Sequence, residues 1–431
     1  MLKICLFNKG LDRIARMELI DSMDKIQLIF FYISGFLISR LVIKVNLPQR
    51  LVFYFIGKKQ SSITKILFFI ILITAFLSFF IPNAIAVLTM LPVLEVLRRL
   101  LKENSVVNKS IPTVLALSVI YGANIGGMSS VTATPANGIF VAFIEANLVA
   151  GRELVGYASW LIWAIPMVLV LILLSFAVLC VTFRPWRYSR ELIRLPFDQN
   201  SINHPLQKAS IIAVIVFIAS SLFFSIVRLQ MPQYTLEVTI SAGIFTAAFI
   251  WFLFNKPLRL GDDGKEAVLL TIPDCYRKLP VKGLIIAGVV ALFGTILYLL
   301  RVHDYFSSVI TGIFPADISP YLFLLILAVV VSFSTEALSN TVVQLGMSLV
   351  IIPVAVSLGV APFAALLVIT LSCTCAFMTP IATGVNGLAY GGVKGVSLIE
   401  MVSVGAIMNL TAALFISFWV NHVVTLIFGL G

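Results

Sequence analysis

A polar stretch at residues 334–341, Ser-Thr-Glu-Ala-Leu-Ser-Asn-Thr, separates two apolar runs at 322–331 and 345–356. Unpaired backbone groups cost several kcal/mol in hydrocarbon, so irregular polar backbone at membrane depth is buried in protein or lines a wet cavity. Each apolar run is shorter than the roughly 20 residues of a membrane-crossing helix. The pattern therefore predicts a re-entrant helical hairpin over 320–356. Its tip is expected at Ser339, Asn340 and Thr341.

Composition sets the class of protein. Hydrophobic residues make up 60% of the chain, charged residues 11%, and the mean hydropathy is +1.08, whereas soluble domains are roughly 45 to 50% apolar. We predict an all-α polytopic protein of the cell membrane, with the lipid bilayer as its surroundings. The net charge of +11 reflects basic loops that orient the helices by the positive-inside rule, and it does not indicate nucleic acid binding.

The first half of the chain repeats the hairpin pattern. Two half-length apolar arms over 64–101 flank a break at residues 81–84, and each hairpin is followed by a further polar interruption, at 133–138 and 382–387. Paired interruptions in corresponding places of two halves indicate a transporter built from repeats, with its site near the bilayer midplane. We therefore expect two broken helices, over 111–149 and 362–390.

Basic residues gather in three loops, at 98–109, 184–208 and 256–282. The positive-inside rule places all three loops in the cytoplasm. The crossings between the loops then bring the first hairpin in from the cytoplasmic face and the second from the outer face. Similar hairpins that enter from opposite faces predict inverted repeats.

These expectations divide the chain into a tail, two repeats and a connecting loop. The tail is 1–26; the first repeat is 27–183, with hairpin 64–101, broken helix 111–149 and scaffold helix 159–182; the cytoplasmic basic loop is 184–208; the second repeat is 209–431, with scaffold helices within 211–300, hairpin 320–356, broken helix 362–390 and last helix 400–430.

In the second half, Thr335-Glu336 precedes Ser339-Asn340-Thr341, and Thr383 follows in the broken helix. With these residues the chain resembles the divalent anion:sodium symporters of the ion transporter superfamily, which carry dicarboxylates, citrate or sulfate. That family has Ser-Asn-Thr at each of two hairpin tips and a Thr-Pro-Pro or similar turn in each broken helix. The resemblance covers roughly residues 27–428, and it implies that N-terminal helices of the family are missing here.

The first half departs from the family pattern. Ser78 and Asn83 are in place, but Pro82 and Ala84 stand where the family has Ser and Thr. The loss of two hydroxyl groups implies that the first tip holds a two-carboxylate substrate less evenly than the second tip does. A smaller anion, or weaker sodium binding at the first tip, follows from this difference.

The resemblance implies two sodium sites and one substrate site between the tips. A hard cation takes oxygen ligands. The first implied sodium site consists of Ser78, Asn83 and the backbone at Ala133. The second consists of Thr335, Asn340 and the backbone at Ala382. The implied substrate ligands are Asn83, Thr134, Asn137, Ser339, Asn340, Thr341 and Thr383. The alternative for the Ser and Thr hydroxyls is that they bond to their own helix backbone. No cofactor other than sodium is expected.

Three ionisable residues lie in apolar surroundings. Charged groups at membrane depth are rare and tend to be functional, so Glu336 is either a site residue or a structural carboxylate that binds hairpin backbone. Glu95 is expected to form an interfacial ion pair one helical turn from Arg98 and Arg99. For His422, near the outer end of the last helix, packing or an interhelical hydrogen bond is favoured over proton transfer.

The predicted function is secondary active transport of a small anion, of the di- or tricarboxylate or sulfate type, coupled to sodium and working by alternating access. The alternatives are an anion exchanger, a metalloid-anion carrier or a cation/proton antiporter of the same superfamily, or a shortened chain without transport activity. A membrane enzyme is disfavoured because no catalytic or phosphate-binding motif occurs. The resemblance also implies a homodimer.

Overall fold

The computed structural model describes residues 32–45, 62–103, 108–152, 155–187, 205–259, 266–276 and 314–429 without 316, and isolated positions between 277 and 313. The chain forms two compact units. The first contains Met1–Val45 and Ser201–Lys278, and the second contains Asn46–Asn200 and Leu279–Gly431. The predicted tail 1–26, most of the loop 184–208 and most of the scaffold span expected at 283–300 lie outside the described residues.

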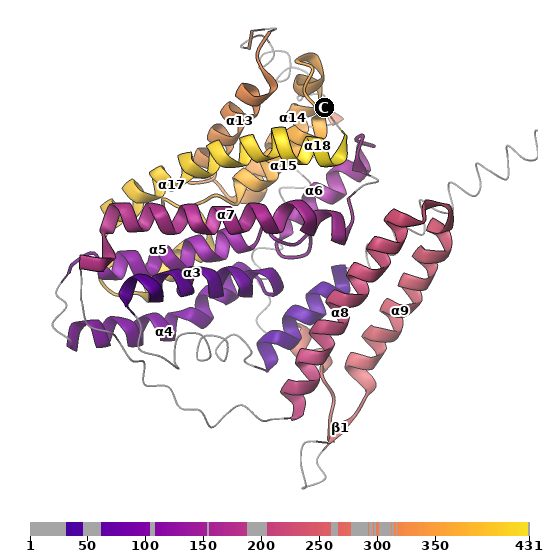
Figure 1. Ribbon diagram of the computed structural model, residues 1–431, viewed down its shortest axis with the longest axis horizontal. Helices are drawn as coiled ribbons and strands as arrows, with labels where there is room; N and C mark the ends of the chain where they lie inside the picture. The colour runs from indigo at the N-terminus through magenta and orange to yellow at the C-terminus, as the bar shows by residue number, and fades with distance from the viewer. Residues whose placement is uncertain are drawn as a thin grey trace, which may run out of the picture. The chain divides into compact units, whose positions relative to one another are not determined.

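Six helices among the described residues are long and apolar enough to cross a membrane (Figure 1). They are Ile63–Phe80, Tyr157–Phe183, Leu206–Arg228, Thr235–Asn255, Asn340–Ser357 and Leu398–Phe428. In the described part of the chain, β-structure is limited to one antiparallel pair, β1 (Leu258–Arg259) and β2 (Glu266–Ala267). The prediction of an all-α polytopic membrane protein is confirmed.

The first unit contains a helix at 32–44 and the helices α8 (Pro205–Gln230) and α9 (Thr235–Asn255). A short 3-10 turn, Pro232–Tyr234, joins α8 to α9, and the unit ends with α10 (Ile272–Tyr276). Lys44 pairs with Asp274 at 2.8 Å. The Phe217 and Phe249 rings stack between α8 and α9 with centroids 6.2 Å apart.

In the second unit, the first half of the chain contributes five helices. They are α3 (Ile63–Phe80), α4 (Asn83–Glu103), α5 (Ile111–Gly126), α6 (Pro135–Ala146) and α7 (Tyr157–Phe183), followed by the 3-10 turn Pro185–Arg187. The hydroxyl of Ser62 caps the start of α3, and Pro82 follows its end, as expected for a residue that cannot continue a helix. α3 and α5 approach closely, because a methyl group at Gly126 would lie 2.3 Å from the Ala75 carbonyl oxygen.

The second half contributes a similar series. It comprises α13 (Pro320–Ser334), α14 (Asn340–Ser357), α15 (Pro362–Cys373), α16 (Gly384–Gly392), α17 (Leu398–Trp419), the π-helical turn Val420–Val424 and α18 (Thr425–Phe428). Pro320 and Pro362 each occupy the first turn of their helix, where the missing N–H leaves no bond unmade.

The unwound segments are 127–134 and 374–383. The first lies within the break expected around 126–137, whereas the second begins eight residues before the interruption expected at 382–387. Asn137 and Asn386 lie in the first turns of α6 and α16. The tip of the second hairpin is likewise 335–339, because Asn340 and Thr341 form the first turn of α14. In the unwound segments, hydrogen bonds from side chains to the backbone replace the backbone hydrogen bonds of a helix, as described below.

Helices α5 and α15 form the core of the second unit. All the residues of α15 from Phe363 to Cys373 are buried, and nearly all of α5 is too. Tyr121 of α5 packs edge-on against Phe377 with ring centroids 5.0 Å apart. The two long helices α7 and α17 lie side by side (Figure 1), and the indole N–H of Trp419 donates to the Trp163 carbonyl at 3.2 Å.

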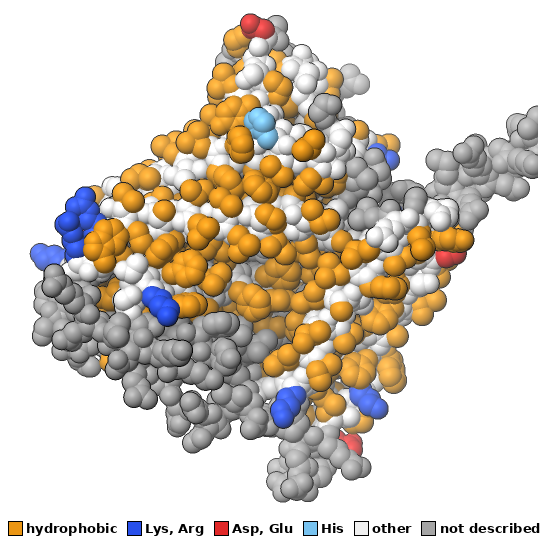
Figure 2. Space-filling view, viewed as in Figure 1, with side chains coloured by type: hydrophobic (Ala, Val, Ile, Leu, Met, Phe, Trp, Pro, Cys, Tyr) orange, Lys and Arg blue, Asp and Glu red, His pale blue; other side chains and the backbone are white. Residues whose placement is uncertain are grey.

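The outer surface of α7 and α17 is apolar. Figure 2 shows hydrophobic side chains over both helices, with Lys and Arg gathered at the margins of the view. The exposed apolar side chains of these helices include Ile162, Leu169, Leu173, Ile407, Leu414 and Phe418. A contiguous apolar surface of this kind marks a membrane interaction surface.

Candidate functional site

The first break brings three predicted residues together at Gly127. A methyl group at Gly127 would lie 2.8 Å from both polar atoms of the Asn83 amide and 2.5 Å from the Thr134 methyl group. Asn137 donates from Nδ2 to the Gly127 carbonyl at 2.9 Å and to the Ser130 carbonyl at 2.7 Å. The absence of a side chain at Gly127 therefore allows the start of α4 to meet the unwound segment.

Three side-chain oxygens at this break, and one in the last turn of α3, are buried and have no hydrogen-bond partner among the described residues. They are Ser78 Oγ, Asn83 Oδ1, Thr134 Oγ1 and Asn137 Oδ1. Buried polar atoms are almost always paired, so these four unpaired oxygens call for an ion or water. Hard cations take oxygen ligands, and of these four atoms Ser78 Oγ and Asn83 Oδ1 belong to the predicted cation site, whereas Thr134 and Asn137 were predicted as substrate ligands.

The second break carries the same four positions, but there the oxygens pair with one another. The Thr335 hydroxyl donates to Asn340 Oδ1 and to the Cys373 carbonyl, the latter at 3.2 Å. The Thr383 hydroxyl donates to Asn386 Oδ1 at 3.1 Å and accepts from the Asn386 backbone N–H at 3.2 Å, which caps α16. Predicted residues Thr335 and Asn340 are thus in direct contact.

Asn137 and Asn386 hold the two unwound segments in the same way. Each side chain donates from Nδ2 to the carbonyls ten and seven residues before it, which are Gly127 and Ser130 in the first half and Ala376 and Thr379 in the second. Asn386 was missed in the sequence analysis. The Thr-x-x-Asn spacing shared by residues 134–137 and 383–386 is the signal that identifies it.

Glu336 binds the second unwound segment directly. Its carboxylate accepts backbone N–H bonds from Phe377 at 2.7 Å, Met378 at 2.9 Å and Thr379 at 2.8 Å. It also accepts a bond from Asn409 Nδ2 at 2.9 Å, and the Thr379 hydroxyl donates to the Glu336 carbonyl at 2.7 Å. Of the two readings from the sequence, these contacts support the structural carboxylate, although its partners lie in the broken helix and in α17, not in the hairpin.

The other predicted residues lie at the ends of the same segments. Ser339 is exposed, and its side chain makes no capping bond to α14. Thr341 is half-buried in the first turn of that helix, while Ala133 and Ala382 are buried at the last positions before Thr134 and Thr383. The hydroxyls of Ser339 and Thr341 thus flank Asn340.

Four helices begin at the breaks, at Asn83 (α4), Pro135 (α6), Asn340 (α14) and Gly384 (α16). α4 and α16 run alongside each other, because a methyl group at Gly392 would lie 2.6 Å from the side chain of Leu91, and each of these residues comes eight positions after the start of its helix. Helix N-termini carry partial positive charge and unpaired N–H groups, which favour anions.

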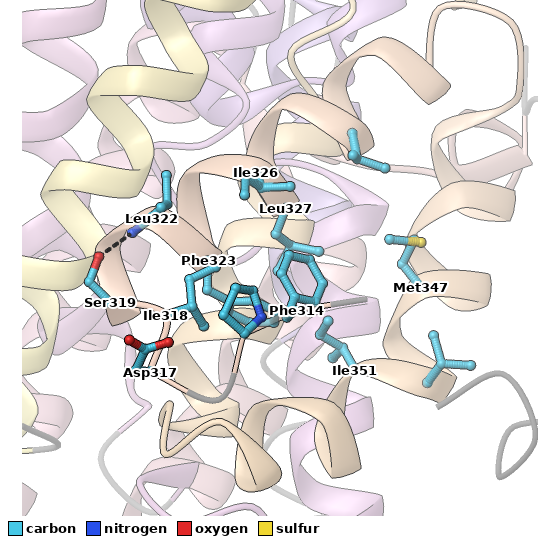
Figure 3. Close-up of a pocket in the computed structure, with 13 residues that line it drawn as sticks. Phe314, Asp317, Ile318, Ser319, Leu322, Phe323, Ile326, Leu327, Met347 and Ile351 are labelled. Carbon is cyan, nitrogen blue, oxygen red and sulfur yellow. Dashed lines mark hydrogen bonds between the residues drawn. The ribbon is translucent and has the colours of Figure 1, made fainter. Parts of the chain in front are cut away.

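A separate apolar cavity of about 760 Å³ lies between α13 and α14, away from the hairpin tip (Figure 3). Its lining residues are mostly apolar and include Phe314, Leu322, Phe323, Leu327, Met347 and Ile351. Asp317 and Ser319, before the start of α13, are its polar members. The cavity lacks the polar groups that an inorganic anion or a dicarboxylate needs.

Two other ionisable residues have structural partners. Glu95 pairs with Arg98 at 2.9 Å and with Arg99 at 3.0 Å, the ion pairs that their spacing predicts. His422 is exposed in the π-helical turn, where its ring stacks on Phe418 with centroids 4.6 Å apart. Packing is therefore the observed role of His422.

Comparison with known proteins relates this chain to sodium-coupled anion transporters. Residues 16–427 match the family model described as the sodium:sulfate symporter transmembrane region. A sodium-dependent dicarboxylate transporter, SdcS, of Staphylococcus saprophyticus is 24% identical over 94% of this chain and 78% of its own length. SdcS of Staphylococcus aureus is 25% identical over 97% of this chain and 81% of its own length. With its apolar helices, the chain is a multi-pass plasma membrane transporter and not an enzyme. The family match extends over nearly the whole chain, so this protein belongs to the sodium:sulfate symporter family.

Proposed function

We propose that the protein uses a sodium gradient to move a small carboxylate anion of the dicarboxylate type across the membrane. The observation that carries this proposal is the pair of matched breaks, each with an Asn at a hairpin tip and a Thr-x-x-Asn pair in a broken helix. The names of its relatives support the substrate class, since both are sodium-dependent dicarboxylate transporters.

Sodium would be held by the oxygens of the breaks. At the first break these are Ser78 and Asn83 with the Ala133 backbone, and the unpaired Thr134 and Asn137 oxygens adjoin them. At the second break they are Thr335 and Asn340 with the Ala382 backbone. Glu336 adds a buried negative charge beside the second break, and such a charge attracts cations strongly in a medium of low dielectric constant.

The anion would be held at the helix starts. Ser339 and Thr341 supply hydroxyls on one side, and Asn83 and Thr134 supply the other side, with the N-termini of the four half-helices as positive ends. The donors of Asn137 and Thr383, the other two predicted ligands, are taken here by the Gly127 and Ser130 carbonyls and by Asn386 Oδ1, so these two residues would position the backbone around the anion. Pro82 and Ala84 cannot donate hydrogen bonds from side chains, so the second tip would carry most of the binding. The substrate would then be held more tightly at one carboxylate than at the other.

Alternating access is part of the proposal. All the predicted ligands lie in the second unit, while α8, α9 and the helix at 32–44 form the first unit. We infer that the hairpins and broken helices of the second unit move against a scaffold to which α7 and the first unit belong, with the hairpins re-entering the membrane from opposite faces as inverted repeats. A homodimer through the scaffold stays a prediction, and native mass spectrometry that shows only monomer would contradict it.

Uptake into proteoliposomes tests the proposed function. Labelled succinate, citrate and sulfate would be offered with an inward sodium gradient and with a matched potassium gradient. We expect sodium-dependent uptake of succinate, and its loss in the Asn83→Ala, Asn340→Ala double variant. Uptake that does not depend on sodium but requires an anion inside the proteoliposomes would support the anion exchanger instead. No uptake of any substrate under either condition would overturn the proposal.

A further inference from the structure

In each half of the second unit, one carboxamide side chain donates a hydrogen bond to a backbone carbonyl in or next to the unwound segment of the other half. Gln344 of α14 donates from Nε2 to the Ala136 carbonyl at the start of α6, at 2.8 Å, and to the Thr370 hydroxyl at 3.1 Å. In the opposite direction, Asn124 of α5 donates from Nδ2 to the Ala376 carbonyl in the second unwound segment at 2.9 Å. The two breaks are therefore joined by two hydrogen bonds that run in opposite directions.

Both bonds end next to residues of the candidate site. Gln344 lies one helical turn after Asn340, and its acceptor Ala136 directly precedes Asn137. The Ala376 carbonyl that accepts from Asn124 also accepts from Asn386 Nδ2 at 3.0 Å. In each direction, a single side chain connects one half to the backbone beside the candidate site of the other half.

The two halves do not share these carboxamides. Aligning Asn83 with Asn340 places Val87 opposite Gln344, and aligning Asn137 with Asn386 places Cys373 opposite Asn124. Neither Val87 nor Cys373 carries a carboxamide. The links are therefore additions to the repeated framework and do not follow from it.

Burial of Gln344 argues against a role in stability alone. Its side chain is 1% exposed, and its Oε1 atom has no hydrogen-bond partner among the described residues. A buried unpaired acceptor is destabilising, and this cost offsets part of what the two hydrogen bonds from Nε2 contribute to stability. A buried carboxamide with an unpaired oxygen indicates a role for Gln344 other than packing.

We propose that Gln344 and Asn124 are positioning residues that couple the two breaks, so that sodium bound at one break raises the affinity of the other for the anion. This rests on the proposed function. Coupling between sites is reciprocal and is measured as the ratio of the affinities for one ligand with and without the other. Loss of the links lowers this ratio, whereas a uniform loss of stability leaves it unchanged.

Binding measurements on the purified full-length protein test the inference. The dissociation constant of succinate would be measured in sodium and in potassium for the wild type, Gln344→Met and Asn124→Leu. The ratio compared is the dissociation constant in potassium divided by that in sodium. In the wild type we expect a ratio of about 5 to 150, the usual range of coupling between sites. In each variant we expect this ratio to fall at least about threefold. Asn124→Leu keeps the test available where Gln344→Met is not recovered folded.

Gln207→Met is the matched control. Gln207 also donates from Nε2 to a backbone carbonyl, that of Val45 at 3.3 Å, and its Oε1 is likewise buried and unpaired in the described structure, but it lies in the first unit. We expect its ratio to equal that of the wild type. A wild-type ratio well above one that survives both site substitutions would overturn the inference alone, whereas a wild-type ratio of one would overturn the proposed function together with the inference.

Discussion

The side chain of Asn409 in α17 donates a hydrogen bond to the carboxylate of Glu336 at 2.9 Å. Together with the three N–H groups of residues 377–379, this bond ties the turn between α13 and α14 to the unwound segment 374–383 and to α17. The carboxylate thereby replaces the helical hydrogen bonds that the unwound segment lacks. One side chain therefore holds three elements of the site together.

Replacing Glu336 with Gln is expected to destabilise the protein and to abolish sodium-dependent uptake. The amide nitrogen of Gln cannot accept from the N–H groups, and a hydrogen bond to a charged group contributes about 1.5 to 3 kcal/mol. Thermal unfolding in detergent would show a clear drop in the midpoint. Glu95→Gln is the control, because a partly exposed ion pair contributes only about 0.2 to 1 kcal/mol. Equal, small shifts for both variants would contradict the role assigned to Glu336.

Gly127→Ala is expected to weaken sodium binding at the first break. The added methyl group would lie 2.5 Å from the Thr134 side chain and 2.8 Å from the Asn83 amide, and such overpacking costs about 1 to 3 kcal/mol. The sodium concentration for half-maximal uptake should rise accordingly. Gly243→Ala, in α9, adds a methyl group with no atom of another segment within 4 Å and should leave this concentration unchanged. An unaltered sodium dependence in Gly127→Ala would contradict the assignment of Asn83 to the cation site.

Thr341→Ala is expected to weaken substrate binding by roughly 10 to 150-fold, the loss of one hydrogen bond to a charged group. The reverse change at the first tip, Ala84→Thr, should leave binding unchanged or strengthen it, and should widen the range of dicarboxylates that bind. Isothermal titration with succinate and longer dicarboxylates measures both effects. If neither substitution changes the affinity, or if both lower it equally, the tips do not hold the substrate.

The sequence predicts the helices of the second unit well and the ends of its breaks poorly. Apolar runs flanked by Ser, Asn and Pro give the arms of both hairpins, since period and composition suffice for that. The second unwound segment starts earlier than expected because residues such as Phe377 are apolar and look like continuing helix. In both segments, side chains from other positions bind the unwound backbone, Asn137 in the first and Glu336 in the second.

The links between distant residues were not predictable from a single sequence. Gln344 and Ala136 are 208 positions apart, and no local pattern connects a buried Gln to a carbonyl in the other half. Asn409 was missed for the same reason, since an Asn in a long apolar helix has many ordinary roles. By contrast, the matched Thr-x-x-Asn pairs were present in the sequence and predict Asn386 as well as Asn137.

Concentrative uptake tests the central claim most directly. Proteoliposomes holding the wild-type protein would be given labelled succinate under an inward sodium gradient, and the internal concentration would be followed before and after an ionophore dissipates the gradient. The account predicts that succinate accumulates above its external concentration and leaves again when the gradient collapses. Succinate that only equilibrates across the membrane, whether or not sodium is present, would contradict a sodium-coupled transporter and indicate a passive pore.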